Sequence, residues 1–193
     1  MPRNREFDPQ QALEDAMGVF WEKGWSATSV EDLVRATGVN RYGLYDVYGS
    51  KRGLFLAALR HYHRTVITEA IRELEEPAAG LEAIQAVFAR IVGRARSGEG
   101  RFGCLLCNSA EEVAPFDEDV AAEVAAYQQR LATNFASAVR VARAAGAVGG
   151  DLDPDETGRF LAGLIQGASY LIRSPASAGE VEDFVRVGLR ILG

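Results

Sequence analysis

The sequence is poor in cysteine and in long apolar runs, and each shortage excludes a class of protein. Two cysteines among 193 residues are too few for a small secreted fold built on disulfide bonds. No apolar stretch approaches the roughly 18–20 residues of a membrane span, and the polar N-terminal residues lack the apolar segment of a signal peptide. We therefore expect a soluble, cytoplasmic protein without a membrane partner.

Basic residues are outnumbered by acidic ones, and the net charge of −6 at first argues against nucleic acid as a partner. The imbalance, however, is confined to one part of the chain. Residues 1–65 contain nine Lys and Arg and eight Asp and Glu, whereas residues 66–193 contain 12 and 19. The N-terminal third thus carries +1 and the remainder −7, which indicates two parts with different partners.

The apolar residues recur mainly with helical periodicity, and no segment shows the apolar–polar alternation typical of strands. Leu13, Ala16, Met17 and Phe20, for example, recur at i, i+3, i+4 and i+7. Glycine, proline and capping residues separate this segment from the later ones. The sequence predicts an all-α fold of about nine helices, over approximate ranges 8–23, 29–37, 41–47, 50–75, 81–96, 102–114, 117–145, 154–173 and 178–192.

Residues 30–47 have the pattern of a helix-turn-helix, with two short helices joined by a turn at Gly38. The second helix contains Arg41, Tyr42 and Tyr45, whose donors and rings can reach base edges in a major groove. This arrangement predicts DNA binding. The alternative is that these are merely short helices of an all-α protein.

Residues at the ends of these helices predict phosphate contacts. Lys51 follows the capping residue Ser50, so that free amides and a cation meet at one helix start. Thr28 is expected as the N-cap of the preceding helix, with Glu31 completing a capping box. Asn40 is expected to cap the second helix of the motif, and we include it in the predicted DNA-binding set.

The run TSVEDLVRATGVNRYGLYDVYGSKRGLF, residues 28–55, resembles without a gap the DNA-binding region of the TetR/AcrR family of repressors. The resemblance implies a TetR-like fold and double-stranded DNA as a partner. It also implies roles for individual side chains: phosphate contacts for Thr28, Tyr45 and Lys51, and base-facing positions for Arg41 and Tyr42.

Two positions depart from the family pattern. Val47 stands where a polar side chain or a histidine is common, so one phosphate contact is expected to be missing. Tyr48 replaces the more usual phenylalanine and adds a hydroxyl group that needs a partner.

The resemblance further implies two domains, a helix-turn-helix domain in residues 1–50 and an effector-binding and dimerisation domain in residues 51–193. The long helix over residues 50–75 is expected to link them. Apolar and aromatic residues on the central helices, together with the two cysteines, form the predicted effector pocket. They are Phe88, Ile91, Phe102, Cys104, Cys107, Tyr127 and Phe135.

The last two helices predict a dimer interface. Gly163 and Gly167 recur four residues apart and allow another helix to approach closely. With Phe184, Val187 and Ile191 they resemble half of a four-helix interface, and a two-fold protein reads a palindrome. The alternative for the glycines is close packing within one subunit.

Cys104 and Cys107 form a C-x-x-C pair on the predicted first turn of a helix, where residues i and i+3 share a face. The helix N-terminus and Arg101 are expected to favour the Cys104 thiolate. The stretch also resembles the NemR-like branch of the family, which implies electrophile sensing. The alternative is that both cysteines are small buried hydrophobic residues. Their spacing to His61 and His63 does not match a zinc finger, and no metal site is expected.

These patterns together predict a homodimeric transcriptional repressor that a small-molecule effector releases from a palindromic operator. The alternative hypothesis is a redox- or electrophile-sensing repressor switched by covalent modification of Cys104 and Cys107. The sequence has no P-loop, dinucleotide fingerprint or nucleophile elbow. We therefore expect neither catalysis nor a cofactor.

Overall fold

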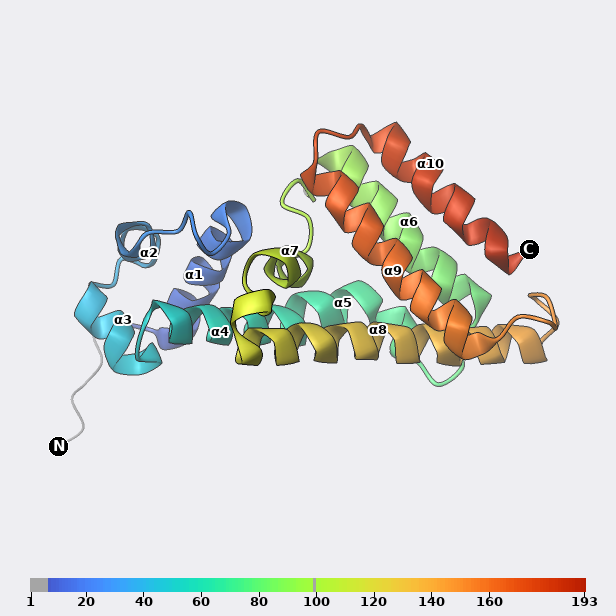
Figure 1. Ribbon diagram of the computed structural model, residues 1–193, viewed down its shortest axis with the longest axis horizontal. Helices are drawn as coiled ribbons and strands as arrows, with labels where there is room; N and C mark the ends of the chain where they lie inside the picture. Colours follow the sequence, from blue (N-terminus) through green and yellow to red (C-terminus); the bar gives the residue numbers. More distant parts are fainter. Residues whose placement is uncertain (1–6, 99) are drawn as a thin grey trace.

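The computed structural model describes residues 7–98 and 100–193, and this part of the chain contains helices and turns but no strand (Figure 1). The predicted all-α fold is confirmed for these residues. Three helices form the N-terminal end: α1 (Pro9–Lys23), α2 (Val30–Thr37) and α3 (Arg41–Tyr48). The other helices follow as α4 (Lys51–Tyr62), α5 (Thr68–Ile71), α6 (Leu81–Ser97), α7 (Leu105–Glu112), α8 (Glu118–Ala144), α9 (Pro154–Arg173) and α10 (Ala178–Leu189).

An aromatic cluster fixes the N-terminal helices to α4. Phe20 of α1 is fully buried, and its ring meets the ring of Phe55 edge to face at a centroid distance of 5.0 Å. Trp25 packs on the same two rings. Leu33 of α2 and Leu44 of α3 are also fully buried. The three short helices therefore share one apolar core that extends into α4.

The capping box of α2 lies one residue later than predicted. Ser29 is the N-cap and Asp32 the N3 residue, and each side chain accepts a backbone N–H of the other. Thr28 is unavailable for this role because its side chain is buried and its hydroxyl donates to the Gly24 carbonyl, 2.6 Å away. Ser29 and Asp32, rather than Thr28 and Glu31, therefore start the helix.

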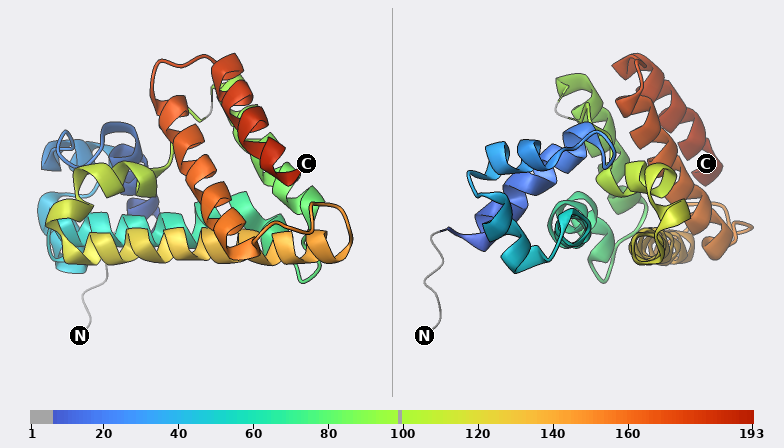
Figure 2. Two further views of the ribbon diagram at one scale, coloured as in Figure 1. Left: turned by 45° about the vertical axis from the view of Figure 1, so that its right-hand side comes forward. Right: turned by 60° about the vertical axis from the view of Figure 1, so that its left-hand side comes forward.

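The predicted helix over residues 50–75 is helical along its length but not uniformly α-helical. A π-helical segment (His63–Ile67) separates α4 from α5, and a 3₁₀ turn (Arg72–Glu75) follows α5. In Figures 1 and 2 this composite helix and α8 run in the same direction along the long axis of the molecule. Single-turn π segments inside α-helices often occur at functional sites.

The opposite end of the molecule is a layer of α6, α9 and α10, inclined to α8 (Figures 1 and 2). Gly158 allows α9 to approach α8, because a Cβ atom there would lie 2.6 Å from the Ala132 carbonyl oxygen. Two short 3₁₀ turns complete this part, Ala114–Phe116 before α8 and Arg190–Leu192 after α10.

Helix α7 begins at Leu105, later than the predicted start near Phe102. Gly103 has a φ of +67°, which a continuing right-handed helix does not permit. A Cβ atom at this position would also lie 2.8 Å from the Ser169 carbonyl oxygen. Cys104 is consequently the N-cap residue of α7 and Cys107 lies in its first turn.

Candidate DNA-binding surface and effector pocket

Helix α3 presents a polar and aromatic face to solvent. Tyr42 is 70% exposed, and Arg41 is exposed beside it. Leu44 anchors the opposite side of the helix in the core. The guanidinium of Arg41 lies over the Tyr45 ring, 5.2 Å from its centroid, so the two side chains stabilise each other while the guanidinium edge stays accessible. Asn40 caps α3, with Oδ1 accepting the Gly43 N–H at 2.9 Å, as predicted.

Lys51 is the first residue of α4, and Ser50 caps that helix by accepting the Gly53 N–H. The Lys51 ammonium donates to the Trp25 carbonyl at 2.7 Å and lies 4.2 Å from the centroid of the Trp25 ring. Partial burial lowers the pKa of Lys51 from its usual range, while the charge of Glu112 opposes that shift. The ammonium is thus held at the start of α4 with donors remaining for a phosphate.

The two departures from the family pattern have different surroundings. The Tyr48 hydroxyl donates to the Pro9 carbonyl at 2.7 Å, which supplies the partner that this extra group requires. Val47 is half-buried and offers no donor. Thr28, although predicted as a phosphate contact, is 1% exposed, and its hydroxyl hydrogen is already used within the chain. Its phosphate role stays a prediction.

Two hydrogen-bonded connections join the helix-turn-helix to the segment that carries the cysteines. The carboxylate of Glu112, at the end of α7, accepts the N–H groups of Trp25 and Ser26 at 2.9 and 2.8 Å. Burial raises the pKa of Glu112, but these N–H groups, together with the Ser26 side chain and the charge of Arg173, lower it below its usual range. At the other end of α7, the Trp21 indole N–H donates to the Gly103 carbonyl at 3.0 Å.

These connections were not predicted from the sequence, because each joins residues more than 80 positions apart. No local pattern marks them. A third connection, in which Arg52 donates to Asp117 and Asp119, joins the start of α4 to the start of α8 in the same way.

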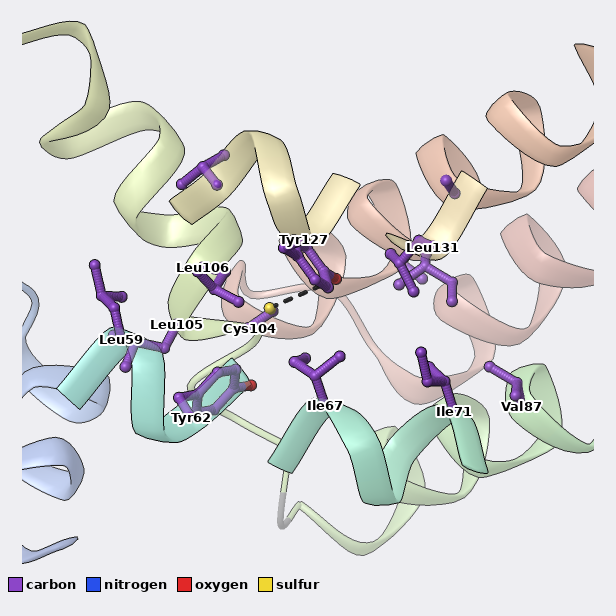
Figure 3. Close-up of a cluster of buried hydrophobic side chains, with 14 of the residues drawn as sticks. Leu59, Tyr62, Ile67, Ile71, Val87, Cys104, Leu105, Leu106, Tyr127 and Leu131 are labelled. Atoms are coloured by element: carbon purple, nitrogen blue, oxygen red, sulfur yellow. Dashed lines mark hydrogen bonds between the residues drawn. The ribbon is translucent and has the colours of Figure 1, made fainter. Parts of the chain in front are cut away.

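A cavity of about 60 Å³, which we call the inner cavity, lies among the composite helix, α6, α8 and α9. Figure 3 shows Tyr62, Ile67 and Ile71 facing Cys104, Tyr127 and Leu131 in this region. Three of the predicted pocket residues line the inner cavity, namely Ile91, Cys104 and Tyr127. Sequence reasoning missed Arg90 and Arg94, which also line it.

The three phenylalanines predicted to line the effector pocket do not line the inner cavity. Phe88 and Phe135 are fully buried and stack on each other at a centroid distance of 5.7 Å, so they form core rather than cavity wall. Phe102 lies under the guanidinium of Arg101, 4.5 Å from the ring centroid, and it lines neither of the two cavities around Tyr127. Periodicity shows which side chains turn inward, but it does not distinguish those that pack from those that border a space.

A larger and more open groove of about 880 Å³, the outer groove, lies on the other side of Tyr127 between α7, α8 and α9. Cys107 lines it, together with Gly163 and Gly167 of α9. Tyr127 therefore separates two spaces, one bordered by each cysteine.

The two thiols and the Tyr127 hydroxyl form a close cluster. The Sγ atoms of Cys104 and Cys107 lie 3.8 and 3.9 Å from the Tyr127 Oη, and both cysteines are free thiols (Figure 3 shows the Cys104 contact). Hydrogen bonding from the Cys107 thiol and backbone, then from Tyr127 and Tyr62, lowers the pKa of Cys104 to about 6, although burial opposes this. The pKa of Cys107 is raised by its interaction with Cys104 and by burial.

The expected role of Arg101 in lowering the pKa of Cys104 was wrong. Arg101, which we expected to favour the thiolate, is exposed and packs on Phe102 instead. Neighbouring hydroxyl, thiol and backbone donors stabilise the charge in its place. The alternative reading of the cysteines as small buried residues agrees with the 5% exposure of Cys104, whereas Cys107 is half-buried.

The predicted dimer residues of α9 and α10 lie on the surface of the chain. Val187 is 54% exposed, Ile191 40% and Phe184 39%. Gly163 has open space where a Cβ atom would stand, whereas a Cβ atom at Gly167 would lie 2.7 Å from the Phe184 ring of the same chain. Close packing within one subunit therefore explains Gly167, and Gly163 remains open for another helix.

Two other classes of feature, a metal site and a membrane span, are absent from the part of the chain that the structure describes. Within residues 7–98 and 100–193, no group of three or more His, Cys, Asp or Glu side chains could hold a metal ion. No helix among the same residues is long and apolar enough to cross a membrane.

Known proteins resemble this chain over its whole length. The family model for bacterial regulatory proteins of the tetR family matches residues 12–58, and that for the tetracyclin repressor-like C-terminal domain matches residues 80–187. The uncharacterised HTH-type transcriptional regulator YezE of Bacillus subtilis (strain 168) is 33% identical over 193 residues, with 100% of both chains covered. The HTH-type transcriptional repressor ComR of Escherichia coli (strain K12) is 31% identical, with 98% of this chain and 90% of its own covered.

A solved structure of a TetR family regulator is also similar to this chain over its whole length. The TetR family regulator CifR, in a cysteine-substituted form complexed with 26-bp double-strand operator DNA, has a TM-score of 0.84 at 28% identity, covering 99% of this chain and 100% of its own. The fold and the exposed face of α3 define a helix-turn-helix DNA-binding protein. The chain belongs to the TetR family of transcriptional regulators. The NemR-like branch stays a prediction.

Proposed function

We propose that this protein is a homodimeric repressor that binds a palindromic operator and leaves it when a small molecule occupies the C-terminal domain. The observation that carries the proposal is the face of α3, where Arg41 and Tyr42 are exposed opposite the buried Leu44. Two relatives support it: ComR is described as a repressor, and CifR was solved on operator DNA.

In the proposed complex α3 lies in the major groove. Arg41 and Tyr42 reach base edges, and Asn40 lies at the start of the helix next to them. Lys51 donates to a phosphate with the N–H bonds that Trp25 leaves free. Tyr45, half-buried under Arg41, takes a further predicted phosphate position. The Thr28 hydroxyl is buried and donates to Gly24, so Thr28 is left out of the proposed phosphate contacts.

Dimerisation places two such helices on one operator. The proposed interface is the exposed apolar face of α9, α10 and the 3₁₀ turn after α10 that contains Gly163, Phe184, Val187 and Ile191. Burying these side chains between two copies removes apolar surface from water, and the two-fold symmetry of the pair matches a palindrome. The proposed domain boundary, after residue 50, coincides with the start of α4 at Lys51.

The proposed effector acts through connections that the structure describes. The inner cavity is bordered by the π segment below α4, through Val66 and Ile67, and by Gly103 and Cys104 before α7. Gly103 accepts from Trp21 of α1, and the far end of α7 holds Trp25 through Glu112. An effector that binds one arrangement of these elements more tightly shifts the population toward it and changes the spacing of the two α3 helices.

The test begins with selection of bound sequences from a random DNA pool by the full chain. We expect a palindromic consensus and, on that DNA, a complex of two subunits by light scattering. Selection of no consensus, or binding as a monomer, contradicts the proposal. Release is then screened by fluorescence anisotropy of the selected DNA against small molecules.

The cysteine cluster favours a second candidate, a thiol switch, because Cys104 has a lowered pKa of about 6 and Cys107 is close to it. Its thiolate attacks an oxygen of hydrogen peroxide and breaks the O–O bond, giving a sulfenic acid and a hydroxide that takes up the proton released by the thiol and becomes water. The Cys107 sulfur then attacks that sulfenic sulfur, forming a disulfide and releasing a second water. The two sulfurs lose two electrons and one hydrogen peroxide is reduced to water.

Mass spectrometry after mild hydrogen peroxide treatment, together with operator release, distinguishes the two candidates. For the switch we expect a Cys104–Cys107 disulfide and release by the unmodified protein, with Cys104→Ser staying bound. Full release of Cys104→Ser by peroxide excludes the switch. The Cys107→Ser variant should stop at the sulfenic acid, which a dimedone probe detects.

A further inference from the structure

The inner cavity contains two guanidinium groups that neither proposed mechanism uses. Arg90 and Arg94, one turn apart on α6, both line it. The rest of the lining is aliphatic or aromatic, apart from the Cys104 thiol and the hydroxyls of Tyr62, Tyr127 and Ser169. None of the lining residues is Asp or Glu. The space therefore has cationic donors at one place and apolar walls elsewhere.

Neither guanidinium has its full set of partners within the described chain. Arg90 pairs with Glu73 through a terminal nitrogen, but its Nε is buried without a hydrogen-bond acceptor. Arg94 lies over the Trp21 ring, 5.7 Å from the centroid, and forms no ion pair with any carboxylate of residues 7–98 or 100–193. Arg94 is thus a partly buried cation without a counter-charge, and Arg90 keeps one donor unused beside it; this arrangement favours the binding of an anion.

The chemistry of the anion follows from the donor type. Guanidinium groups present planar pairs of N–H donors that match the two oxygens of a carboxylate. The space is small, about 60 Å³, and partly open to solvent, so a carboxylate with a short apolar chain fits it better than a bulky one.

We infer that the inner cavity binds a small organic carboxylate, with the carboxylate on Arg90 and Arg94 and the apolar body against Ile67, Ile71 and Leu131. This inference rests on the proposed function, because it names the chemical class of the effector. Arg94 contacts Trp21 of α1, so the bound anion lies one side chain away from the DNA-binding helices.

Calorimetric titration of the full-length protein with sodium butyrate, and with its neutral isostere butanamide, tests the charge requirement. Butyrate should bind at least about tenfold more tightly than butanamide, a difference of roughly 1.4 kcal/mol. Equal affinity of the two probes, or no detectable butyrate binding at millimolar concentration, overturns the inference.

Matched variants test the residues. Arg94→Gln, which removes no ion pair within the described chain, should abolish the preference for butyrate over butanamide. Arg90→Lys keeps the charge and the pairing with Glu73 but loses the planar pair of donors, and should weaken butyrate binding several-fold. Arg101→Gln, outside the cavity, should leave it unchanged. Undiminished butyrate binding by both cavity variants overturns the assignment.

Operator release is measured separately, so that the two proposals fail in different ways. Butyrate that binds in an Arg94-dependent manner without releasing operator DNA leaves the carboxylate site standing and contradicts the effector mechanism. Release by a neutral molecule of similar size, with no Arg94 dependence, supports the mechanism and contradicts the carboxylate site.

Discussion

The helix-turn-helix end and the cavity end of this chain differ in how far apart in sequence their interacting residues lie. In α2 and α3 the caps are formed by residues three positions apart, Ser29 with Asp32 and Asn40 with Gly43. Around the inner cavity the walls come from four separate helical segments. The polar face of α3 is thus specified locally, whereas the cavity exists only once the whole domain has packed.

The two ends also differ in charge, and this changes the meaning of the net charge of −6. The acidic excess lies beyond residue 65, while the region around α3 is nearly neutral. DNA affinity must therefore come from individually placed groups such as Arg41 and Lys51, and from helix N-termini, rather than from a broad basic field.

Removal of one buried aromatic ring from each end is expected to have the largest effect on stability. Phe20→Ala and Phe135→Ala each truncate a fully buried ring and should cost about 3–5 kcal/mol of unfolding free energy. Both tryptophans, Trp21 and Trp25, lie at the helix-turn-helix end. Their fluorescence therefore reports that end, whereas circular dichroism reports the whole chain.

In urea unfolding we expect the two signals to coincide for both variants, because α4 and α7 connect the two ends into one cooperative unit. A fluorescence transition that precedes the circular dichroism transition in Phe20→Ala, but not in Phe135→Ala, would show instead that the helix-turn-helix end unfolds alone.

The next largest effect is expected at the recognition surface. Tyr42→Ala should relax selectivity at one base position of the selected operator by about 1–3 kcal/mol, because Tyr42 is 70% exposed and is expected to face the bases. Tyr170→Ala, which removes a 61% exposed tyrosine ring on α9 and outside the helix-turn-helix, is the matched control. Competition assays on single-base operator variants measure both. An unchanged selectivity profile for Tyr42→Ala means that this side chain does not read sequence.

A smaller and different effect is expected at Lys51. Lys51→Ala should weaken binding evenly across sequences and reduce the slope of log affinity against log salt by about one phosphate contact. The control is Arg64→Ala, an exposed cation on the π segment and away from α3. Anisotropy titrations at several salt concentrations give the slope. If Lys51→Ala keeps the parent slope, its ammonium serves only the Trp25 carbonyl.

The sequence predicted the all-α fold, the position of the helix-turn-helix and the cap at Asn40, because hydrophobic period and capping chemistry are local properties. It misplaced the start of α2 by one residue, since two hydroxyl residues stand side by side and only the fold buries Thr28. Of the residues predicted for the effector pocket, Ile91, Cys104 and Tyr127 line the inner cavity, whereas Phe88 and Phe135 stack on each other in the core. Whether an inward ring stacks on a neighbour or borders a space depends on long-range packing, as do the positions of Arg90 and Arg94.

The smallest effect in the series tests the connection between the two ends. Glu112 accepts two backbone N–H groups of the α1–α2 connection, and Glu112→Gln keeps one acceptor oxygen but removes the charge. Hydrogen bonds to charged groups are stronger than neutral ones, and partial exposure reduces the difference, so we expect a loss of about 1 kcal/mol at pH 7. Glu111→Gln, exposed and adjacent, should change little.

The pH dependence gives this prediction its sign. Because the pKa of Glu112 is lowered in the folded protein, its carboxylate stabilises the fold above the ordinary glutamate pKa, and that contribution disappears as the pH falls through the lowered value. The stability difference between the parent and Glu112→Gln, measured by urea unfolding, should therefore shrink in acid. In operator assays the same variant should need less effector for release, since the contact that holds α7 to the helix-turn-helix is weaker. A stability difference that is constant down to the acid limit of folding, with unchanged effector sensitivity, would mean that Glu112 fills space at this contact and does not couple the two ends.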